Sequence, residues 1–84
     1  MSVVEEAIFS PCSGTVETVL TEENNHVYEW EKLLLIKTHN GSIEEISIGI
    51  SGYITYLPVK KGQQVNSQTV LAIIQDDMKI TGSD

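Results

Sequence analysis

The stretch that decides the fold of this chain reads Leu33-Leu34-Leu35-Ile36-Lys37-Thr38-His39-Asn40-Gly41-Ser42-Ile43. Asn-Gly between two apolar-rich segments is the strongest short signal of a β-hairpin, because both central residues of a type I′ turn need positive φ. Asparagine tolerates that backbone conformation and glycine adopts it freely. The stretch therefore predicts two strands joined by a two-residue turn at Asn40-Gly41.

The segments beside this turn have the residue pattern of strands. Ile46, Ile48 and Ile50 alternate with Ser47 and Gly49, which is the period of a strand with one apolar face. No window of the chain carries an apolar stripe of helical spacing longer than two turns. We therefore expect an all-β fold.

An internal repeat relates the two sides of the turn. Sliding the chain so that Ser13-Gly14 falls on Ser51-Gly52 also places Asn24 on Gly62, and both of these suit a left-handed backbone. The same ungapped shift aligns four apolar pairs: Val16 with Ile54, Val27 with Val65, Leu33 with Leu71, and Ile36 with Ile74. Because a lone hairpin-sized sheet is marginal in water, we expect two halves that cover each other about a pseudo-twofold axis.

Composition excludes several classes of partner. The 84 residues suffice for one domain, and they carry a net charge of −7 with five lysines and no arginine. Nucleic acid and anionic membrane surfaces would be repelled. The acidic surface is either simply solvated or a docking face for a basic partner. With no apolar run of membrane-spanning length, no signal peptide pattern and a single cysteine, a cytoplasmic protein is expected.

The second half contains the more specific motifs, which are Ile50-Ser51-Gly52-Tyr53-Ile54, Val59-Lys60-Lys61-Gly62-Gln63-Gln64-Val65 and Leu71-Ala72-Ile73-Ile74. The first half repeats their order in residues 10–16, 23–27 and 33–36. Over residues 8–75 this pattern resembles biotinyl/lipoyl carrier domains, including biotin carboxyl carriers. The resemblance implies a barrel-sandwich hybrid, a flattened barrel of two four-stranded sheets. It gives a domain over residues 8–76, a lead-in over 1–7 and a flexible tail over 77–84.

The resemblance also implies an attachment lysine at the tip of the hairpin between the halves, and here the chain departs from the family. The tip residues are His39, Asn40 and Gly41, none of which has a primary amine. Counting from the two halves places the lysine position on Asn40 or on Gly41, which suggests one inserted residue near Glu44-Glu45. No biotin or lipoate is therefore expected at the tip.

Lys37 is the amine nearest to the tip. In a strand it lies roughly 10 Å from Asn40. Its repeat partner is Gln75, a surface-type residue, so plain solvation or a salt bridge is the simpler interpretation. Attachment of biotin or lipoate at Lys37 is the alternative.

The remaining candidate residues point to contact rather than catalysis. Tyr28 and Trp30 either pack over the rim of the barrel or form an exposed aromatic patch for a partner. Cys12, His26 and His39 lack the spacing of a zinc site, and nothing supplies Cys12 with a base. Neither an active site nor a metal site is expected, and the chain would be a monomer or weak dimer.

Two functions follow from the resemblance. The first is a binding or scaffold module, not itself acylated, that works with carboxylase or acyltransferase subunits. The second is a genuine carrier subunit of an acyl-CoA carboxylase-type complex, modified at a displaced lysine such as Lys37. A barrel-sandwich piece of a membrane-fusion adaptor is a third possibility, although those proteins need long coiled-coil segments that this sequence lacks.

Overall fold

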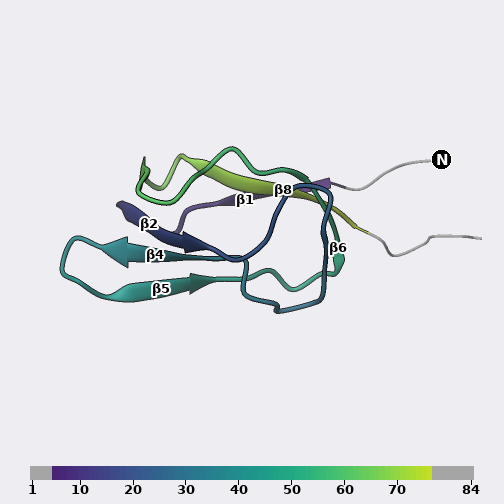
Figure 1. Ribbon diagram of the computed structural model, residues 1–84, viewed down its shortest axis with the longest axis horizontal. Helices are drawn as coiled ribbons and strands as arrows, with labels where there is room; N and C mark the ends of the chain where they lie inside the picture. Colours follow the sequence, from purple (N-terminus) through teal and green to yellow (C-terminus); the bar gives the residue numbers. More distant parts are fainter. Residues whose placement is uncertain (1–4, 77–84) are drawn as a thin grey trace, which may run out of the picture.

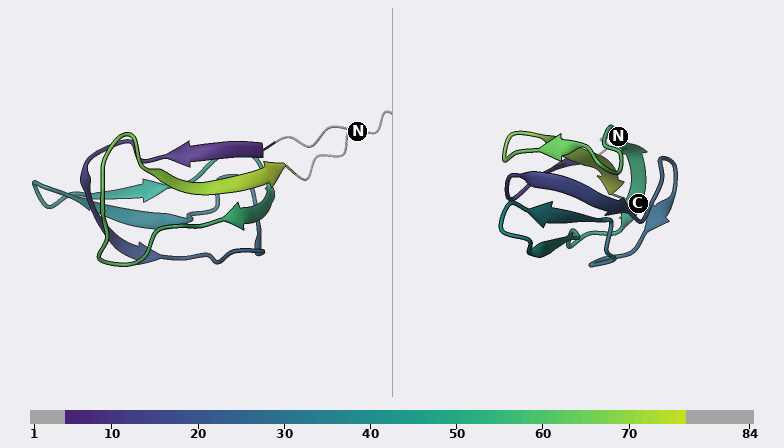
Figure 2. Two further views of the ribbon diagram at one scale, coloured as in Figure 1. Left: turned by 90° about the horizontal axis from the view of Figure 1, so that it is seen from above. Right: turned by 60° about the vertical axis from the view of Figure 1, so that its left-hand side comes forward.

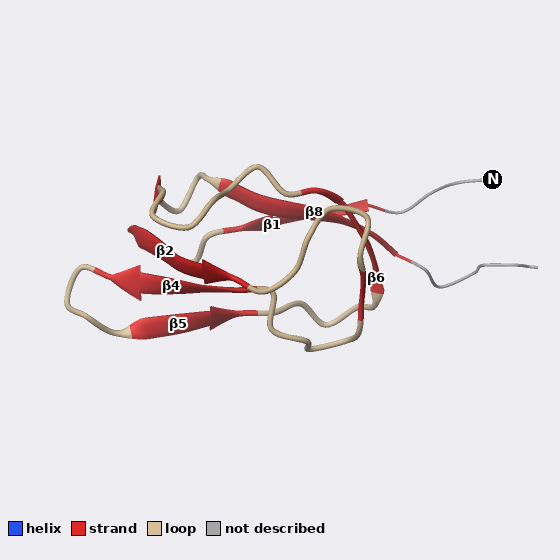
Figure 3. Ribbon diagram, in the orientation of Figure 1, coloured by secondary structure: helices blue, strands red, loops and turns tan. Residues whose placement is uncertain are grey.

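The computed structural model describes residues 5–76, and all regular elements in that range are β-strands (Figures 1 and 3). The strands are β1 (Glu5–Phe9), β2 (Gly14–Val19), β3 (His26–Val27), β4 (Leu34–Thr38), β5 (Ile43–Ile46), β6 (Gly52–Tyr56), β7 (Gln64–Val65) and β8 (Val70–Asp76). The predicted lead-in of residues 1–7 overlaps β1, which begins at Glu5. The predicted tail, residues 77–84, lies outside the described residues.

The strands form two antiparallel four-stranded sheets that pack as a flattened sandwich and do not close into a barrel (Figure 2). The strand order is β1-β8-β6-β3 in one sheet and β5-β4-β2-β7 in the other. The predicted all-β fold with two four-stranded sheets is thus confirmed.

The two halves exchange strands rather than merely facing each other. Each sheet takes two strands from the half β1–β4 and two from the half β5–β8. Replacing every strand of one sheet by its repeat partner gives the order of the other sheet. Turns cross over as well, since the Asn24 N–H donates to the Ile54 carbonyl at 2.7 Å and the Gly62 N–H donates to the Val16 carbonyl at 2.8 Å. Neither half can therefore complete a sheet alone.

Irregular features of the backbone repeat too. Asn24 and Gly62, the aligned turn residues, both have positive φ, at 73° and 89°, as the sequence predicts. A register shift falls at Glu17 in β2, and another falls at Thr55, its partner in β6. Such β-bulges bend and twist the strand that carries them, so both sheets curve at matching points.

The core fills the space between the two sheets. Its buried apolar residues come from both halves, and all except Val59 form aligned pairs, so each half supplies a similar apolar surface. The largest are Val16, Val27, Leu33, Leu34, Ile36, Ile54, Leu71 and Ile74.

The strand predicted from the alternation of Ile46, Ile48 and Ile50 is shorter than expected, because β5 ends at Ile46. The Ile48 carbonyl accepts a hydrogen bond from the Trp30 N–H at 2.8 Å instead of continuing a ladder. Ile48 and Ile50 still pack against the core from a loop. The apolar positions were thus correct, and the extent of the strand was wrong.

Two glycines allow a close approach between strands. A Cβ atom placed on Gly14 would overlap the carbonyl oxygen of Lys37, and one placed on Gly52 would overlap that of Gln75. The two glycines are repeat partners, and so are Lys37 and Gln75. The motif Ser-Gly recurs in the sequence because the same backbone contact recurs in the fold.

Replacing either of these glycines by alanine should destabilise the protein strongly. The added methyl group meets backbone atoms, which cannot swing aside, so we expect Gly14→Ala and Gly52→Ala each to lower the free energy of unfolding by about 3 kcal/mol. Gly41→Asn is the control, because nothing lies within 4 Å of its Cβ position and asparagine tolerates positive φ. Because the φ of 89° strains any side chain even in open space, this variant should cost about 1 kcal/mol, clearly less than a methyl group placed against backbone atoms. Urea unfolding measures all three, and equal effects would contradict this account.

The strand exchange predicts that the halves depend on each other. Peptides covering residues 1–40 and 41–84 should each lack β structure in far-ultraviolet circular dichroism, because each would leave both of its sheets incomplete. Mixing them should restore the spectrum of the intact chain. A half that folds by itself would show that the exchange is not essential.

Candidate functional site

The hairpin between β4 and β5 protrudes at one end of the molecule, away from the start of β1 and the end of β8 (Figure 1). Its ladder runs regularly from Leu34 paired with Ile46 to Lys37 paired with Ile43. Beyond it the Thr38 N–H donates to the Ser42 carbonyl at 2.8 Å, and the Gly41 N–H donates to the Thr38 carbonyl at 3.0 Å. We call residues 38–42 the hairpin tip.

The tip corrects the predicted turn. Gly41 has a φ of 89°, whereas Asn40 does not have positive φ, so the loop is His39-Asn40-Gly41 and not a two-residue type I′ turn. A three-residue loop with a left-handed glycine is the next commonest hairpin connection. The β4–β5 ladder has no register shift at Glu44-Glu45. The three-residue loop has Asn40 at its apex.

The side chain of Asn40 is folded back onto the loop. The Ser42 N–H donates to Asn40 Oδ1 at 3.3 Å and to Thr38 Oγ1 at 3.1 Å. The Thr38 hydroxyl also donates to Asn40 Oδ1. These contacts satisfy the backbone of the tip locally, which explains why the loop takes three residues. At one of the two positions where the family resemblance implies a lysine, Asn40 presents a carboxamide that is engaged in its own turn.

A shallow hollow of about 410 Å³ lies beside the tip. Ser13 lines it from the loop before β2, and Glu44 lines it from β5, together with Thr38, His39, Asn40 and Ser42. Its hydroxyls, amide, imidazole and carboxylate can exchange hydrogen bonds with a polar partner. His39 and Asn40 were predicted as site residues, whereas Ser13 was not; it precedes Gly14, which lies in close contact with β4.

Lys37 lies in the sheet rather than at the tip. It occupies β4, where its backbone pairs with Thr15 of β2 on one side and Ile43 of β5 on the other. Its side chain is exposed on the outer face of that sheet. The amine is reachable by solvent, but it is held on a central strand and is not carried on the turn.

Tyr28 and Trp30 are exposed to 70% and 66%, and one side of the Trp30 ring lies against Gly49. The His26 ring stands edge-on to the rings of Tyr28 and Tyr53, each with a centroid distance of 4.9 Å. The sequence pattern did not predict this grouping, because it depends on the pairing of β3 with β6 of the other half, which brings His26 opposite Tyr53.

Within residues 5–76, no group of three or more His, Cys, Asp or Glu side chains is arranged to hold a metal ion. The same range contains no helix long and apolar enough to cross a membrane. Cys12 is partly buried against the core, which agrees with its alignment with Ile50.

No known family and no curated protein matches this chain by sequence. Solved structures do match its fold. One is the urea carboxylase of Kluyveromyces lactis, with a TM-score of 0.76, 18% identity and 88% of this chain covered. Another is a single-chain, multi-domain long-chain acyl-CoA carboxylase, with a TM-score of 0.79, 17% identity and 90% coverage. The chain spans only 6% and 7% of those two proteins, so what they share with it is the fold of one small module.

The tip contacts predict a local effect of Thr38→Val. The substitution removes the hydroxyl that accepts from the Ser42 N–H, so exchange of that amide should accelerate and stability should fall by about 1 kcal/mol. Hydrogen exchange followed by nuclear magnetic resonance measures both. His39→Ala is the matched control, since no hydrogen bond of its side chain is described, and it should leave Ser42 exchange unchanged. Equal rates in the two variants would contradict the role of Thr38.

Proposed function

We propose that this chain is a protein-binding module related to the carrier modules of carboxylases, and that it works without an acyl group at its hairpin tip. The observation that supports this proposal most directly is the position of Asn40, which lies at the apex of the tip with its carboxamide engaged in the turn. The fold shared with modules of two carboxylases supports the relationship.

The chemistry of attachment supports an unmodified tip. Forming an amide with biotin or lipoate requires an unhindered primary amine. The amide nitrogen of Asn40 is delocalised into its carbonyl and is not nucleophilic, while Gly41 offers only backbone. The residues of the tip therefore do not fit either cofactor. Lys37 supplies an amine, but its backbone is paired on both sides in β4.

A binding role fits what the tip retains. The hairpin projects from the sandwich, the His39 imidazole is exposed at its end, and the hollow beside it is lined with hydrogen-bonding groups. Such a surface suits a protein partner, and carboxylase or acyltransferase subunits are the proposed class. No catalytic role is proposed, since the tip brings together no activated nucleophile.

Mass measurement tests the proposal directly. Co-expression with a biotin-protein ligase or a lipoate-protein ligase should leave the intact mass of the chain unchanged. A gain of one biotinyl or lipoyl group would overturn the proposal. If Lys37→Arg then removed the added mass, the chain would be a carrier modified at that displaced lysine.

Asn40→Lys is the matched variant, because it places an amine at the apex. We expect this variant to gain one acyl group in the same cells. That result would show that the natural tip is not acylated because it lacks an amine. The ligase's own carrier domain serves as the positive control. If the variant stays unmodified while the control domain is acylated, the lack of acylation would instead be due to the conformation of the three-residue loop.

A further inference from the structure

The end of the molecule opposite the hairpin tip carries exposed aromatic side chains. We call residues 28–31, Tyr28-Glu29-Trp30-Glu31, the aromatic turn. It follows β3, which pairs with the start of β6 beside the end of β8, where the described chain leaves the sandwich (Figure 1). Its two aromatic residues are the most exposed large apolar side chains of the described residues.

Trp30 is held at the surface in a strained conformation. Its φ is 66°, which is unusual for a bulky residue and marks a place where the surroundings override local preference. The Trp30 N–H is anchored on the Ile48 carbonyl at 2.8 Å. The indole ring lies over Gly49, where a Cβ atom would approach it to 2.7 Å. The ring is thus fixed on one face and open to solvent on the rest.

The repeat provides an internal comparison for this turn. Its partner, residues 66–69, is Asn66-Ser67-Gln68-Thr69. In both turns the last N–H donates to the first carbonyl at 2.9 Å. Both also bond the first N–H to the last side chain, which is Glu31 in one turn and Thr69 in the other. The backbones differ at one position, since Trp30 has positive φ and its partner Gln68 does not. Small polar residues nevertheless make the same two closing hydrogen bonds, so these bonds do not require the aromatic side chains of Tyr28 and Trp30.

Charge indicates what these side chains meet. Glu29 and Glu31 alternate with the two aromatic residues, and all four are exposed. The ring faces of tyrosine and tryptophan attract guanidinium and ammonium groups, and neighbouring carboxylates pair with the same groups. The whole chain has 12 acidic residues against five lysines, so a cationic segment is also favoured at longer range.

We propose that the aromatic turn, with His26 and Tyr53 beside it, docks an arginine- or lysine-containing segment of a protein partner. Trp30 and Tyr28 supply the faces on which the cationic side chains rest, and Glu29 and Glu31 neutralise their charge. The site lies away from the hairpin tip and does not depend on whether the tip is acylated.

The single tryptophan of the chain makes the site observable. The probe is a short capped peptide of alternating arginine and glycine, and its control is the same peptide with citrulline in place of arginine. Adding the arginine peptide should change Trp30 fluorescence and shift the amide resonances of residues 26–31 and 53. The citrulline peptide should bind at least about tenfold more weakly.

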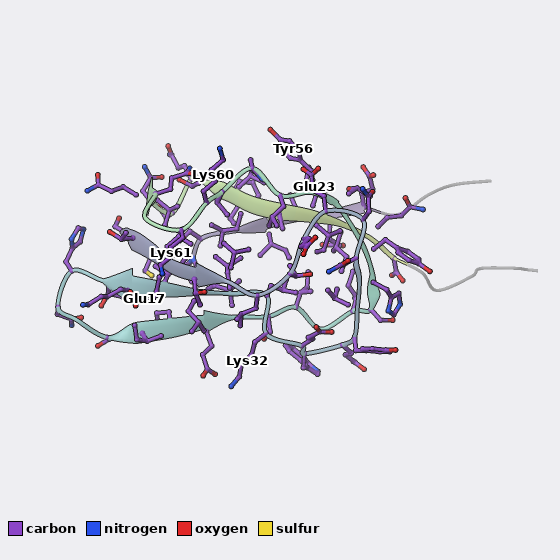
Figure 4. The ribbon with its side chains drawn as sticks, in the orientation of Figure 1. Glu17, Glu23, Lys32, Tyr56, Lys60 and Lys61 are labelled. Carbon is purple, nitrogen blue, oxygen red and sulfur yellow. The ribbon has the colours of Figure 1, made fainter. Side chains whose placement is uncertain are left out.

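Two variants separate the aromatic and charge contributions. Tyr28→Asn with Trp30→Gln introduces the residues found at the aligned positions 66 and 68, which make the same two closing hydrogen bonds. The fold should therefore persist while affinity measured by calorimetry falls about tenfold or more. Glu29→Gln with Glu31→Gln keeps the oxygen that accepts from the Tyr28 N–H but removes both charges, and should lower both affinity and its dependence on salt. Tyr56→Asn is the control for an exposed tyrosine elsewhere. Figure 4 draws Tyr56 on the opposite edge of the molecule from Lys32, which follows the aromatic turn.

Several outcomes would overturn the proposal. Equal binding of the citrulline peptide would exclude recognition of the cation. Resonance shifts spread evenly over the acidic residues, or an equal loss in the Tyr56 variant, would show a non-specific charge effect. Concentration-dependent dimerisation that disappears in the Tyr28/Trp30 variant, with no peptide binding, would assign the patch to a second copy of the chain.

Discussion

At two places in this protein the backbones of neighbouring strands lie closer than any side chain would permit. Gly14 meets the Lys37 carbonyl and Gly52 meets the Gln75 carbonyl, and repeat symmetry makes these the same contact twice. Each contact is at the start of a strand that contributes to the buried layer, at Val16 and at Ile54. One contact joins β2 to β4 and the other joins β6 to β8, so each sheet contains one of them.

The sequence predicted much of this fold because each pattern of turn and apolar residues occurs twice, once in each half. The left-handed positions at Asn24 and Gly62 were read correctly from residue type and alignment. The exchange of strands between the halves was not predicted, because an alignment of the two halves does not show which half supplies the adjacent strand in a sheet. The end of β5 was missed for a similar reason. The carbonyl of Ile48 is bonded by Trp30, a residue distant in sequence, which no local pattern reveals.

The candidate sites divide in the same way. That the tip has no amine follows from residue identity, so it was available from the sequence alone. The length of the loop was not, because Thr38 and Asn40 both bond the Ser42 N–H, and the preference of Asn-Gly for a type I′ turn takes no account of such side chains. Tyr28 and Trp30 were recognised as a pair, whereas their exposure and the neighbouring rings of His26 and Tyr53 required the pairing of β3 with β6.

The pairing of β1 with β8 has a consequence for how such a module is connected. Glu5 lies opposite Gln75, so the described chain enters and leaves the sandwich through adjacent strands at one end. A segment with neighbouring entry and exit points can be spliced into a loop of another protein without altering the path of its host. The hairpin tip would then face outward from the splice, while the aromatic turn would lie beside the junction.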